Sequence, residues 1–273
     1  MNWLSVRVRP GGTSEAALAA LFEMGSMGVH EAGAELVTHF DDTADVDAIT
    51  AAVHAADPDA VVTATIIPAV DWAEEWKKGV RAHELGALTI VPPWLADGRD
   101  PARTVIIEPE MAFGTGEHET TRGVVRLLPS MIRAGDQVAD LGAGSAVLAI
   151  AAAKLGASRV TALELDHDAI ANAIENVERN GVGHIVSVIE GDAGVLLSFV
   201  APLRIVLANI ISSVLREMLP VIATALTPDG EAAISGILVE ERAEMLAFLD
   251  ETGWRVLAED AEGFWWSARI ARR

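Results

Sequence analysis

Strand–helix alternation is the feature that most constrains the fold of this chain. From about residue 103 onward, short apolar runs alternate with longer segments whose apolar residues recur every three or four positions. The runs predict strands and the longer segments predict helices. The expected strands are RTVIIE (103–108), QVADLG (137–142), RVTALEL (159–165), IVSVIEGD (185–192), LRIVLANI (203–210) and EAAISGI (231–237). Such alternation implies an α/β domain with a mainly parallel sheet and helices on both faces.

The two ends of the chain follow other patterns. WRVLAEDAEGFWWSARI (254–270) predicts a hairpin that adds an antiparallel edge. The first 67 residues predict the order β-α-β-β-α-β, typical of a small ferredoxin-like domain. DWAEEWKKGVRA (71–82) predicts a linker helix with Trp72 and Trp76 on one face, where they dock on a neighbour or simply pack. We therefore expect a small domain over 1–67, a linker over 68–84 and an α/β domain over 85–273.

Charge and composition narrow the choice of partners. The chain has 40 acidic residues against 20 lysines and arginines, a net charge of −20. This balance argues against direct binding of nucleic acid, and it either attracts a basic protein or simply solvates the surface. The chain has no cysteine, which excludes disulfides and thiolate sites. Its longest apolar run, at 146–157, is broken by Lys154 and is too short to span a bilayer, so we expect a cytoplasmic protein without a membrane partner.

A glycine loop follows the strand QVADLG. Gly142 and Gly144 lie between an expected strand and an expected helix, at the carboxyl end where open α/β sheets bind ligands. Glycine permits a sharp turn there, and Ser145 is a candidate cap for the helix. The dinucleotide fingerprint requires a third glycine where this chain has Val147, and no phosphate-loop sequence is present. The loop therefore fits either a plain tight turn or a cofactor without a diphosphate.

Polar residues end the neighbouring strands. Glu164 comes 22 residues after Gly142, where an acid accepts hydrogen bonds from ribose hydroxyls. A ribose site without a diphosphate cradle suggests S-adenosylmethionine. Asp192 is placed either to meet the adenine amino group or to serve as a turn acid. Asn209 ends an apolar strand, but the following residues lack the prolines and aromatic ring that adenine methyltransferases use on a flipped base, which argues against nucleic acid as substrate.

EPEMAFGTGEHETTRG (108–123) combines glycines, threonines and a histidine. A zinc-binding helix of H-E-x-x-H type would need its second histidine where this chain has Arg122, so we expect no metal site. His118 has two interpretations, a general base or a cap of the helix that starts beside it, and we favour the cap.

Four segments of the chain, taken in order, resemble one family. AFGTGEHETT, DLGAGSAVLAIAAAKLGA, ALELDHDAIANAIENVERNGV and LANIISSVLREMLPVIATALTPDGEAAISGIL are similar to segments of the PrmA family. This family methylates large-subunit ribosomal protein eleven with S-adenosylmethionine. The resemblance is strong over about 103–240, continues through DWAEEWKKG, and is weak over 1–65.

The resemblance implies an architecture and an activity. It implies a ferredoxin-like domain that recognises the substrate, a linker, and a class I, Rossmann-like methyltransferase domain with a mainly parallel seven-stranded sheet. The implied reaction moves methyl groups from S-adenosylmethionine to lysine ε-amines or the N-terminal α-amine of large-subunit ribosomal protein eleven, with S-adenosylhomocysteine as the product. Two alternatives stay open: a methyltransferase of the same fold acting on another protein or a small amine, and a cofactor-binding module without catalysis.

The resemblance also implies site residues. It places cofactor contacts at Thr121, Gly142, Glu164 and Asn209, and it places Phe113, Gly114 and Thr115 where cofactor and amine meet. Together with the strand ends, the expected cofactor site comprises Gly114, Thr121, Gly142, Gly144, Glu164, Asp192 and Asn209. The expected catalytic residues are Phe113, Thr115, His118 and Asn209. The chain departs from the family pattern with Ala143 for a frequent cysteine, Ala146 for the usual glycine and Glu164 for the commoner aspartate.

Overall fold

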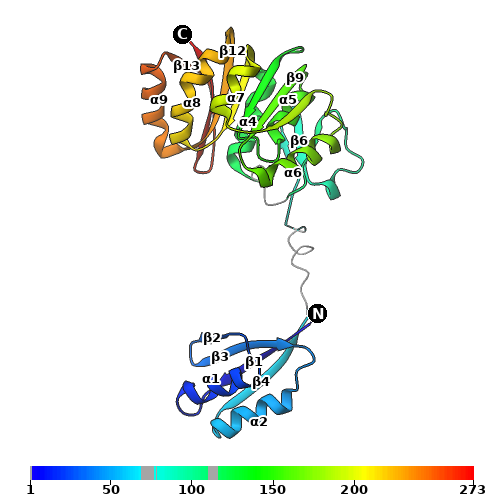
Figure 1. The fold of residues 1–273 in the computed structure, drawn as a ribbon, viewed down its shortest axis with the longest axis vertical. Coiled ribbons are helices and arrows are strands. Elements are labelled where there is room, and N and C mark those ends of the chain that lie inside the picture. Colours follow the sequence, from blue (N-terminus) through cyan, green and yellow to red (C-terminus); the bar gives the residue numbers. More distant parts are fainter. Residues whose placement is uncertain (1, 69–76, 78, 110–115) are drawn as a thin grey trace. The chain divides into compact units, whose positions relative to one another are not determined.

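The chain divides into two compact units, Met1–Gly79 and Val80–Arg273. A computed structural model describes residues 2–68, 77, 79–109 and 116–273 (Figure 1). The expected linker helix lies largely outside the described residues, and Trp72 and Trp76 are among those not described.

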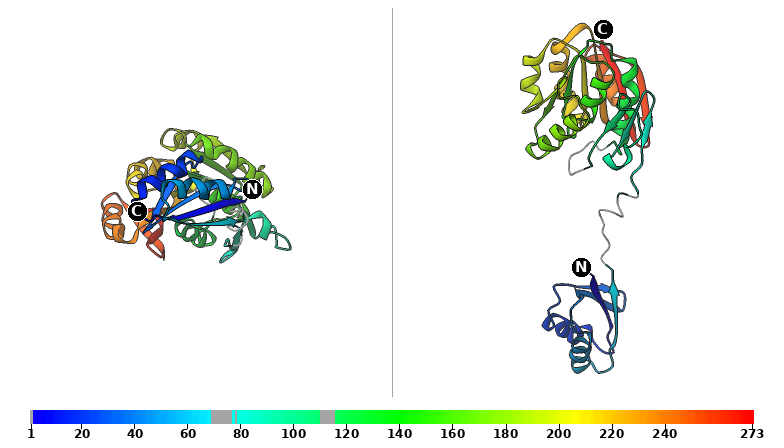
Figure 2. Two further views of the ribbon diagram at one scale, coloured as in Figure 1. Left: turned by 90° about the horizontal axis from the view of Figure 1, so that it is seen from below. Right: turned by 90° about the vertical axis from the view of Figure 1, so that its right-hand side faces the viewer.

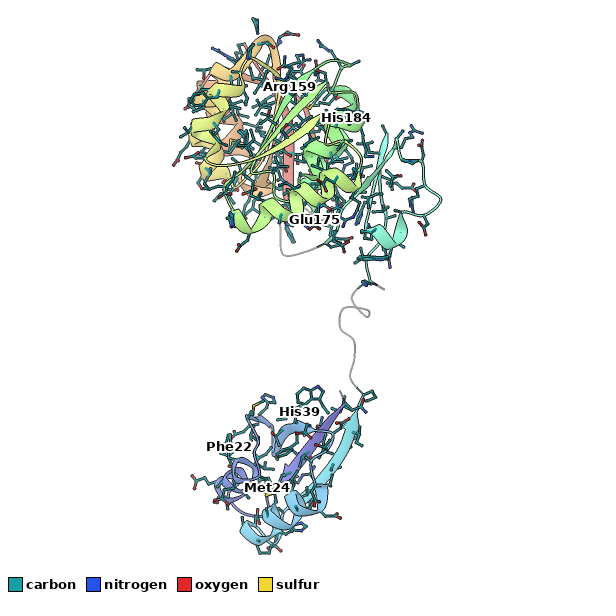
Figure 3. The ribbon with its side chains drawn as sticks, turned by 45° about the vertical axis from the view of Figure 1, so that its right-hand side comes forward. Phe22, Met24, His39, Arg159, Glu175 and His184 are labelled. Atoms are coloured by element: carbon teal, nitrogen blue, oxygen red, sulfur yellow. The ribbon has the colours of Figure 1, made fainter. Side chains whose placement is uncertain are left out.

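The smaller unit is a four-stranded antiparallel sheet with two helices. Its elements are β1 (Trp3–Arg9), α1 (Ser14–Glu23), β2 (Val29–Ala32), β3 (Glu35–Asp41), α2 (Val46–Ala56) and β4 (Val61–Ile67). The strand order is β2-β3-β1-β4, which confirms the ferredoxin-like prediction. Leu4, Val6 and Val8 alternate along β1 and are buried in the core beneath α1 and α2. The sheet's other face carries the residues between them and exposed side chains such as His39 on β3 (Figure 3).

The larger unit holds the predicted α/β alternation. Its first elements are β5 (His83–Leu85), β6 (Leu88–Val91), η1 (Pro93–Leu95), β7 (Thr104–Ile106), α4 (Glu119–Leu127), η2 (Leu128–Ser130), β8 (Gln137–Leu141), α5 (Val147–Lys154), β9 (Arg159–Glu164) and α6 (His167–Arg179). The remainder are β10 (Val186–Glu190), α7 (Ala193–Val200), β11 (Leu203–Asn209), α8 (Ser212–Ala225), β12 (Leu226–Leu238), η3 (Val239–Glu241), α9 (Arg242–Glu251), β13 (Trp254–Glu262) and β14 (Trp265–Arg272).

Seven of these strands form one sheet in the order β10-β9-β8-β11-β12-β14-β13. The first five run parallel, and β14 pairs antiparallel with both β12 and β13. The chain moves outward from β8 to β10 and then returns to β11, on the other side of β8. The switch point of the sheet is therefore between β8 and β11, and ligands bind at the carboxyl ends of strands beside such a point.

The predicted C-terminal hairpin is confirmed, and its second strand is the one that inserts into the sheet. β14 lies between β12 and β13, so β13 forms the edge. The prediction that 103–108 belongs to the main series of strands is wrong. β7 instead pairs in parallel with β6 in a separate sheet of order β5-β6-β7, and side chains rather than a strand of the large sheet occupy its other edge.

Those side chains are three asparagines spaced four apart on α6 and just beyond it. Asn180 donates from Nδ2 to the Ile106 carbonyl at 2.6 Å and accepts from the Ile106 N–H at 2.9 Å. Asn176 accepts from the Glu108 N–H at 2.9 Å, and Asn172 donates to the Glu108 carbonyl at 3.4 Å. Residues four apart share one helix face, so the three side chains line up along the strand. We call Asn172, Asn176 and Asn180 the asparagine ladder.

Helices cover both faces of the large sheet (Figures 1 and 2). Residues of α4, α5 and α6 pack on one face and residues of α7, α8 and α9 on the other. Along β11, Ile205 and Leu207 face the first group while Val206 and Ala208 face the second. Burial on both faces explains why the strands read as continuous apolar runs. Within the described residues, no helix is both long and apolar enough to cross a membrane.

Candidate functional site

The glycine loop turns at the carboxyl end of β8. Gly142 and Gly144 have φ angles of 66° and 51°, a region that side chains disfavour. The N–H groups of Gly142 and Ala143 donate to the Leu163 carbonyl at 2.9 and 3.1 Å, so the loop is fastened to the end of β9. A Cβ atom on Gly142 would lie 2.9 Å from Ile210 Cγ2. Both the turn and the close packing therefore require glycine here.

Ala146 shares this conformation without being glycine. Its φ is 62°, it is fully buried, and it occupies the N-cap position of α5 without a side-chain hydrogen bond. The prediction that Ser145 caps this helix is wrong, because the chain enters the helix one residue later through the left-handed turn. For an L-residue with a Cβ atom, that conformation costs about 1–2 kcal/mol.

Glu164 links the glycine loop to the end of β9. Its Oε2 accepts from the Gly144 N–H at 2.7 Å, and its Oε1 accepts from the N–H groups of Leu165 and Asp166, both at 2.8 Å. A carboxylate offers about four acceptor positions. The side chain, which is partly buried, therefore holds the loop and keeps acceptor capacity toward a ligand.

A pocket of about 200 Å³ opens beside this carboxylate. Its lining is mainly apolar, with Asp192 and Glu164 at the polar end. The lining residues are Leu141, Gly142, Leu163, Glu164, Leu165, Gly191, Asp192, Ala193, Ile210, Val214 and Met218. Asp192 is the N-cap of α7 and accepts from the Gly194 N–H at 2.7 Å, so it is a strand-end turn acid that also faces the pocket. We call this hollow the first pocket.

Asn209 ends β11 on the other side of the switch point. Its Nδ2 donates to Thr121 Oγ1 of α4 at 3.4 Å, and Thr121 is fully buried. Among the described residues no donor reaches its Oδ1, although that atom is buried. A buried acceptor without a partner costs free energy, which a ligand N–H would recover. Asn209 and Thr121, both predicted site residues, are 88 positions apart in the sequence, and the fold brings them into contact.

A second pocket, of about 270 Å³, lies next to Asn209. It is lined by His118, Thr120, Asn209, Ile210, Ile211, Gly236 and Trp265. Ile210 also lines the first pocket, so the two pockets meet at this residue. His118 is the N-cap of α4, as its favoured interpretation predicts: Nδ1 lies 2.8 Å from Thr120 Oγ1 and accepts from the Thr120 N–H at 3.4 Å. Its ring meets Trp265 edge-on at 5.0 Å.

Gly236 packs against the residue that lies between the two pockets. Its φ is 83°, and a Cβ atom there would lie 2.3 Å from the Ile210 carbonyl oxygen. β12 changes register between Ile234 and Ile237, where this glycine sits. The irregular strand brings its backbone against Ile210, the residue that both pockets share.

The two pockets together form a two-part cleft at the switch point of the large sheet. The sequence model of the PrmA family, described as ribosomal protein L11 methyltransferase (PrmA), matches residues 13–273. The chain belongs to this family.

Relatives named for the same activity cover most of the chain. A ribosomal protein L11 methyltransferase of Pelotomaculum thermopropionicum is 39% identical over 76% of this chain and 68% of its own length. That of Synechococcus sp. (strain RCC307) is 32% identical over 99% of this chain and 97% of its own length. The crystal structure of a ribosomal protein L11 methylase from Lactobacillus delbrueckii subsp. bulgaricus superposes with a TM-score of 0.62 at 28% identity, covering 71% of this chain and all (100%) of that one. PrmA membership confirms the resemblance and the Rossmann-like methyltransferase fold.

Three residues that the PrmA resemblance assigns to the site, Phe113, Gly114 and Thr115, lie outside the described residues. Their roles stay predictions, as do the cofactor and catalytic roles of the residues that the structure does describe. Among the described residues, no group of three or more His, Asp or Glu side chains is arranged to hold a metal ion.

Three residues in or beside this PrmA-type site were not predicted from the sequence. Trp265 and Gly236 line the second pocket, but they read as ordinary members of strands. Asp140, on β8 below the glycine loop, accepts from the Ala149 N–H at 2.9 Å through Oδ2, and its Oδ1 has no partner among the described residues. Burial raises the pKa of Asp140 to about 8. The signal for Asp140 was present, since it is an ionisable residue among the buried positions of β8, whose other buried residues are apolar.

Proposed function

We propose that this chain transfers methyl groups from S-adenosylmethionine to lysine ε-amines or the N-terminal α-amine of ribosomal protein L11. The observation that carries the proposal is the buried Oδ1 of Asn209, which no donor among the described residues reaches. It lies in the second pocket, which adjoins the first pocket at Ile210. An amine N–H is a donor of the kind that this atom lacks.

The first pocket fits the cofactor. The glycine loop presents backbone with no Cβ atom at Gly142, Glu164 keeps acceptor capacity for ribose hydroxyls, and Leu165, Ala193 and Met218 offer apolar walls for an adenine ring. When bound, S-adenosylmethionine supplies a methyl group on a positively charged sulfur and leaves as S-adenosylhomocysteine, so the protein mainly positions and desolvates.

The second pocket fits a neutral amine. None of the described residues that line it is a carboxylate. In such surroundings desolvation favours the uncharged amine, which has the lone pair that the reaction needs. Asn209 Oδ1 accepts one amine N–H and so aims the nitrogen lone pair toward the first pocket. Trp265 and His118 exclude water from one side, and the proton released by the nitrogen passes to solvent.

The activity for which the family and its relatives are named supports ribosomal protein L11 as the acceptor. The net charge of −20 suits a basic acceptor protein rather than nucleic acid. In this proposal the ferredoxin-like unit, residues 1–67, recognises that acceptor, and the cytoplasm, where ribosomal proteins are made, is the site of action.

The proposal is tested by incubating the full-length protein with purified ribosomal protein L11 and radiolabelled S-adenosylmethionine. Label should appear in L11, and mass spectrometry should place it on lysine ε-amines or the α-amine. Absence of label while calorimetry shows intact cofactor binding would refute L11 as the acceptor.

Two other outcomes point to the alternatives. Labelling of a different protein in a cell lysate, with L11 unlabelled, would identify a methyltransferase of the same fold with another acceptor. Cofactor binding without any turnover would identify a non-catalytic module.

A further inference from the structure

Exposed apolar side chains border the second pocket. Ile211 lies where β11 meets α8, Val239 begins η3, and Phe264 lies in the turn between β13 and β14, with exposed fractions of 64%, 44% and 81%. We call Ile211, Val239 and Phe264 the apolar rim. Large apolar side chains that gather at one place on a surface mark an interaction site more often than scattered ones do.

Hydrogen bonds fasten the three segments of the rim to one another. The Val239 N–H donates to the Phe264 carbonyl at 2.8 Å. Glu241, two residues after Val239, accepts from the Ser212 hydroxyl at 2.6 Å, which ties η3 to the residue following Ile211. Ile211 itself lines the second pocket, and so does Trp265, the neighbour of Phe264. The rim is therefore one surface at the pocket mouth.

Three carboxylates lie beside the segments of the rim, one of which, Glu119, is also 3.6 Å from Arg122. Glu240 follows Val239 and is exposed, and Glu119 lies 3.7 Å from the position of a Cβ atom on Gly263, in the same turn as Phe264. Glu241 accepts from both the Ser212 hydroxyl and the Leu238 N–H, bonds that lower its pKa and keep it ionised. An apolar centre with a negative border complements a partner that carries an apolar side chain flanked by cationic ones.

The size of the second pocket limits how much of the acceptor protein can enter it. A hollow of about 270 Å³ admits one amine-bearing side chain or one chain terminus, so the residues next to the amine remain outside at the mouth. We propose that the apolar rim binds an apolar side chain adjacent to the methylated amine, in an extended and basic segment of the acceptor protein. This inference rests on the proposed function and adds a sequence preference to it.

The test compares two phenylalanines of similar exposure. Phe264 is 81% and Phe199 78% exposed. Phe199 lines a different hollow with Arg159 at the start of β9, the opposite end of that strand from Glu164 (Figure 3). Steady-state kinetics with the acceptor protein should show KM raised about tenfold in Phe264→Ala, the loss typical of an interface anchor, and unchanged in Phe199→Ala.

Two further measurements separate binding from folding and charge. Cofactor affinity and the melting temperature should match wild type in Phe264→Ala, because the carbonyl that Val239 contacts is retained. The acceptor KM should rise with ionic strength in wild type and less steeply in Glu240→Gln.

Each remaining outcome overturns the inference. Equal acceptor KM values in the two phenylalanine variants would show that the rim does not bind the acceptor. A dimer in sedimentation experiments that Phe264→Ala dissociates, with the acceptor KM unchanged, would assign the rim to a second copy of this chain. Failure of the proposed function gives a different result, because wild type would then not label L11. The two phenylalanine variants would in that case be compared with the acceptor protein that lysate labelling identifies. Equal KM values for that acceptor would again show that the rim does not bind it.

Discussion

The two sides of the cleft differ in how far apart their parts lie along the chain. On the cofactor side, the Gly144 N–H reaches the Glu164 carboxylate, 20 positions away. On the acceptor side, Asn209 contacts Thr121 across 88 positions, and the Ser235 hydroxyl donates to the Thr120 carbonyl across 115. The contact between the glycine loop and Glu164 thus lies within one strand–loop–helix–strand unit, to which the later segments around Asp192 and Met218 add apolar and polar lining. The contacts of the acceptor side exist only once distant segments meet on the sheet.

This difference predicts a separation of function. Changes on the cofactor side should weaken cofactor binding and spare the rate at saturation, whereas changes on the acceptor side should slow turnover and spare cofactor binding. Variants on both sides of the cleft, and on the elements between them, test this separation.

Asn209→Ala should have the largest effect. Losing one positioned hydrogen-bond partner of the reacting group typically lowers kcat about 10²–10³-fold. Cofactor affinity, measured by calorimetry, should change much less. Thr121→Val serves as the control, because among the described residues the Thr121 hydroxyl hydrogen-bonds only with Asn209 Nδ2, at 3.4 Å. If Thr121→Val slows turnover as much as Asn209→Ala does, Asn209 acts through its position and not through its own oxygen.

Glu164→Gln should come second. The amide has one acceptor oxygen for the three N–H groups that Glu164 now satisfies, and it cannot offer a charged acceptor to the ribose. Cofactor Kd should rise about 10–100-fold, as expected for hydrogen bonds to a charged group, with kcat at saturating cofactor near wild type. Glu190→Gln is the matched control, since Glu190 pairs in register with Glu164 at the end of β10. A fall in kcat of Glu164→Gln at saturating cofactor would contradict the predicted separation of cofactor binding from turnover.

Asp140 lies on β8, which both sides share, so its change should alter stability. Burial raises its pKa to about 8, so the protonated carboxyl is the form that the fold favours. Its contribution is fully present below the unfolded pKa and is lost as pH rises from about 4 to about 8. Asp140→Asn does not titrate and still accepts from Ala149. Its stability advantage over wild type should therefore be about 3–4 kcal/mol greater at pH 8 than at pH 5. Calorimetric melting at both pH values measures this, and a constant difference would contradict it.

Ala146→Gly should have the smallest effect. Relief of the left-handed strain, about 1–2 kcal/mol, offsets the lost buried methyl and the added freedom of the unfolded chain, so stability should stay within about 1 kcal/mol of wild type. Ala152 is equally buried but lies inside α5. Ala152→Gly has no strain to relieve and should be less stable than Ala146→Gly by about 1–2 kcal/mol. Equal melting temperatures of the two variants would show that Ala146 is not strained.

The same contrast explains what the sequence predicts. Strand and helix positions, the glycine loop and the placement of Glu164 follow from local period and short motifs. Trp265 could not be assigned to the site from sequence, because it is a strand aromatic until β14 inserts between β12 and β13 and brings it against His118. Gly236 likewise gains meaning only from its closeness to Ile210. The misplacement of 103–108 has the same origin, since an apolar strand does not reveal which sheet it joins.

The asparagine ladder has one further consequence. An uncovered strand edge is a template on which another chain can add a strand, and proteins protect such edges with charges, prolines or covering elements. Here the side-chain amides of Asn180, Asn176 and Asn172 occupy the outward-facing groups of Ile106 and Glu108, and Pro109 then follows with no N–H to offer. The helix seals this edge against strand addition, which protects the protein from edge-to-edge aggregation.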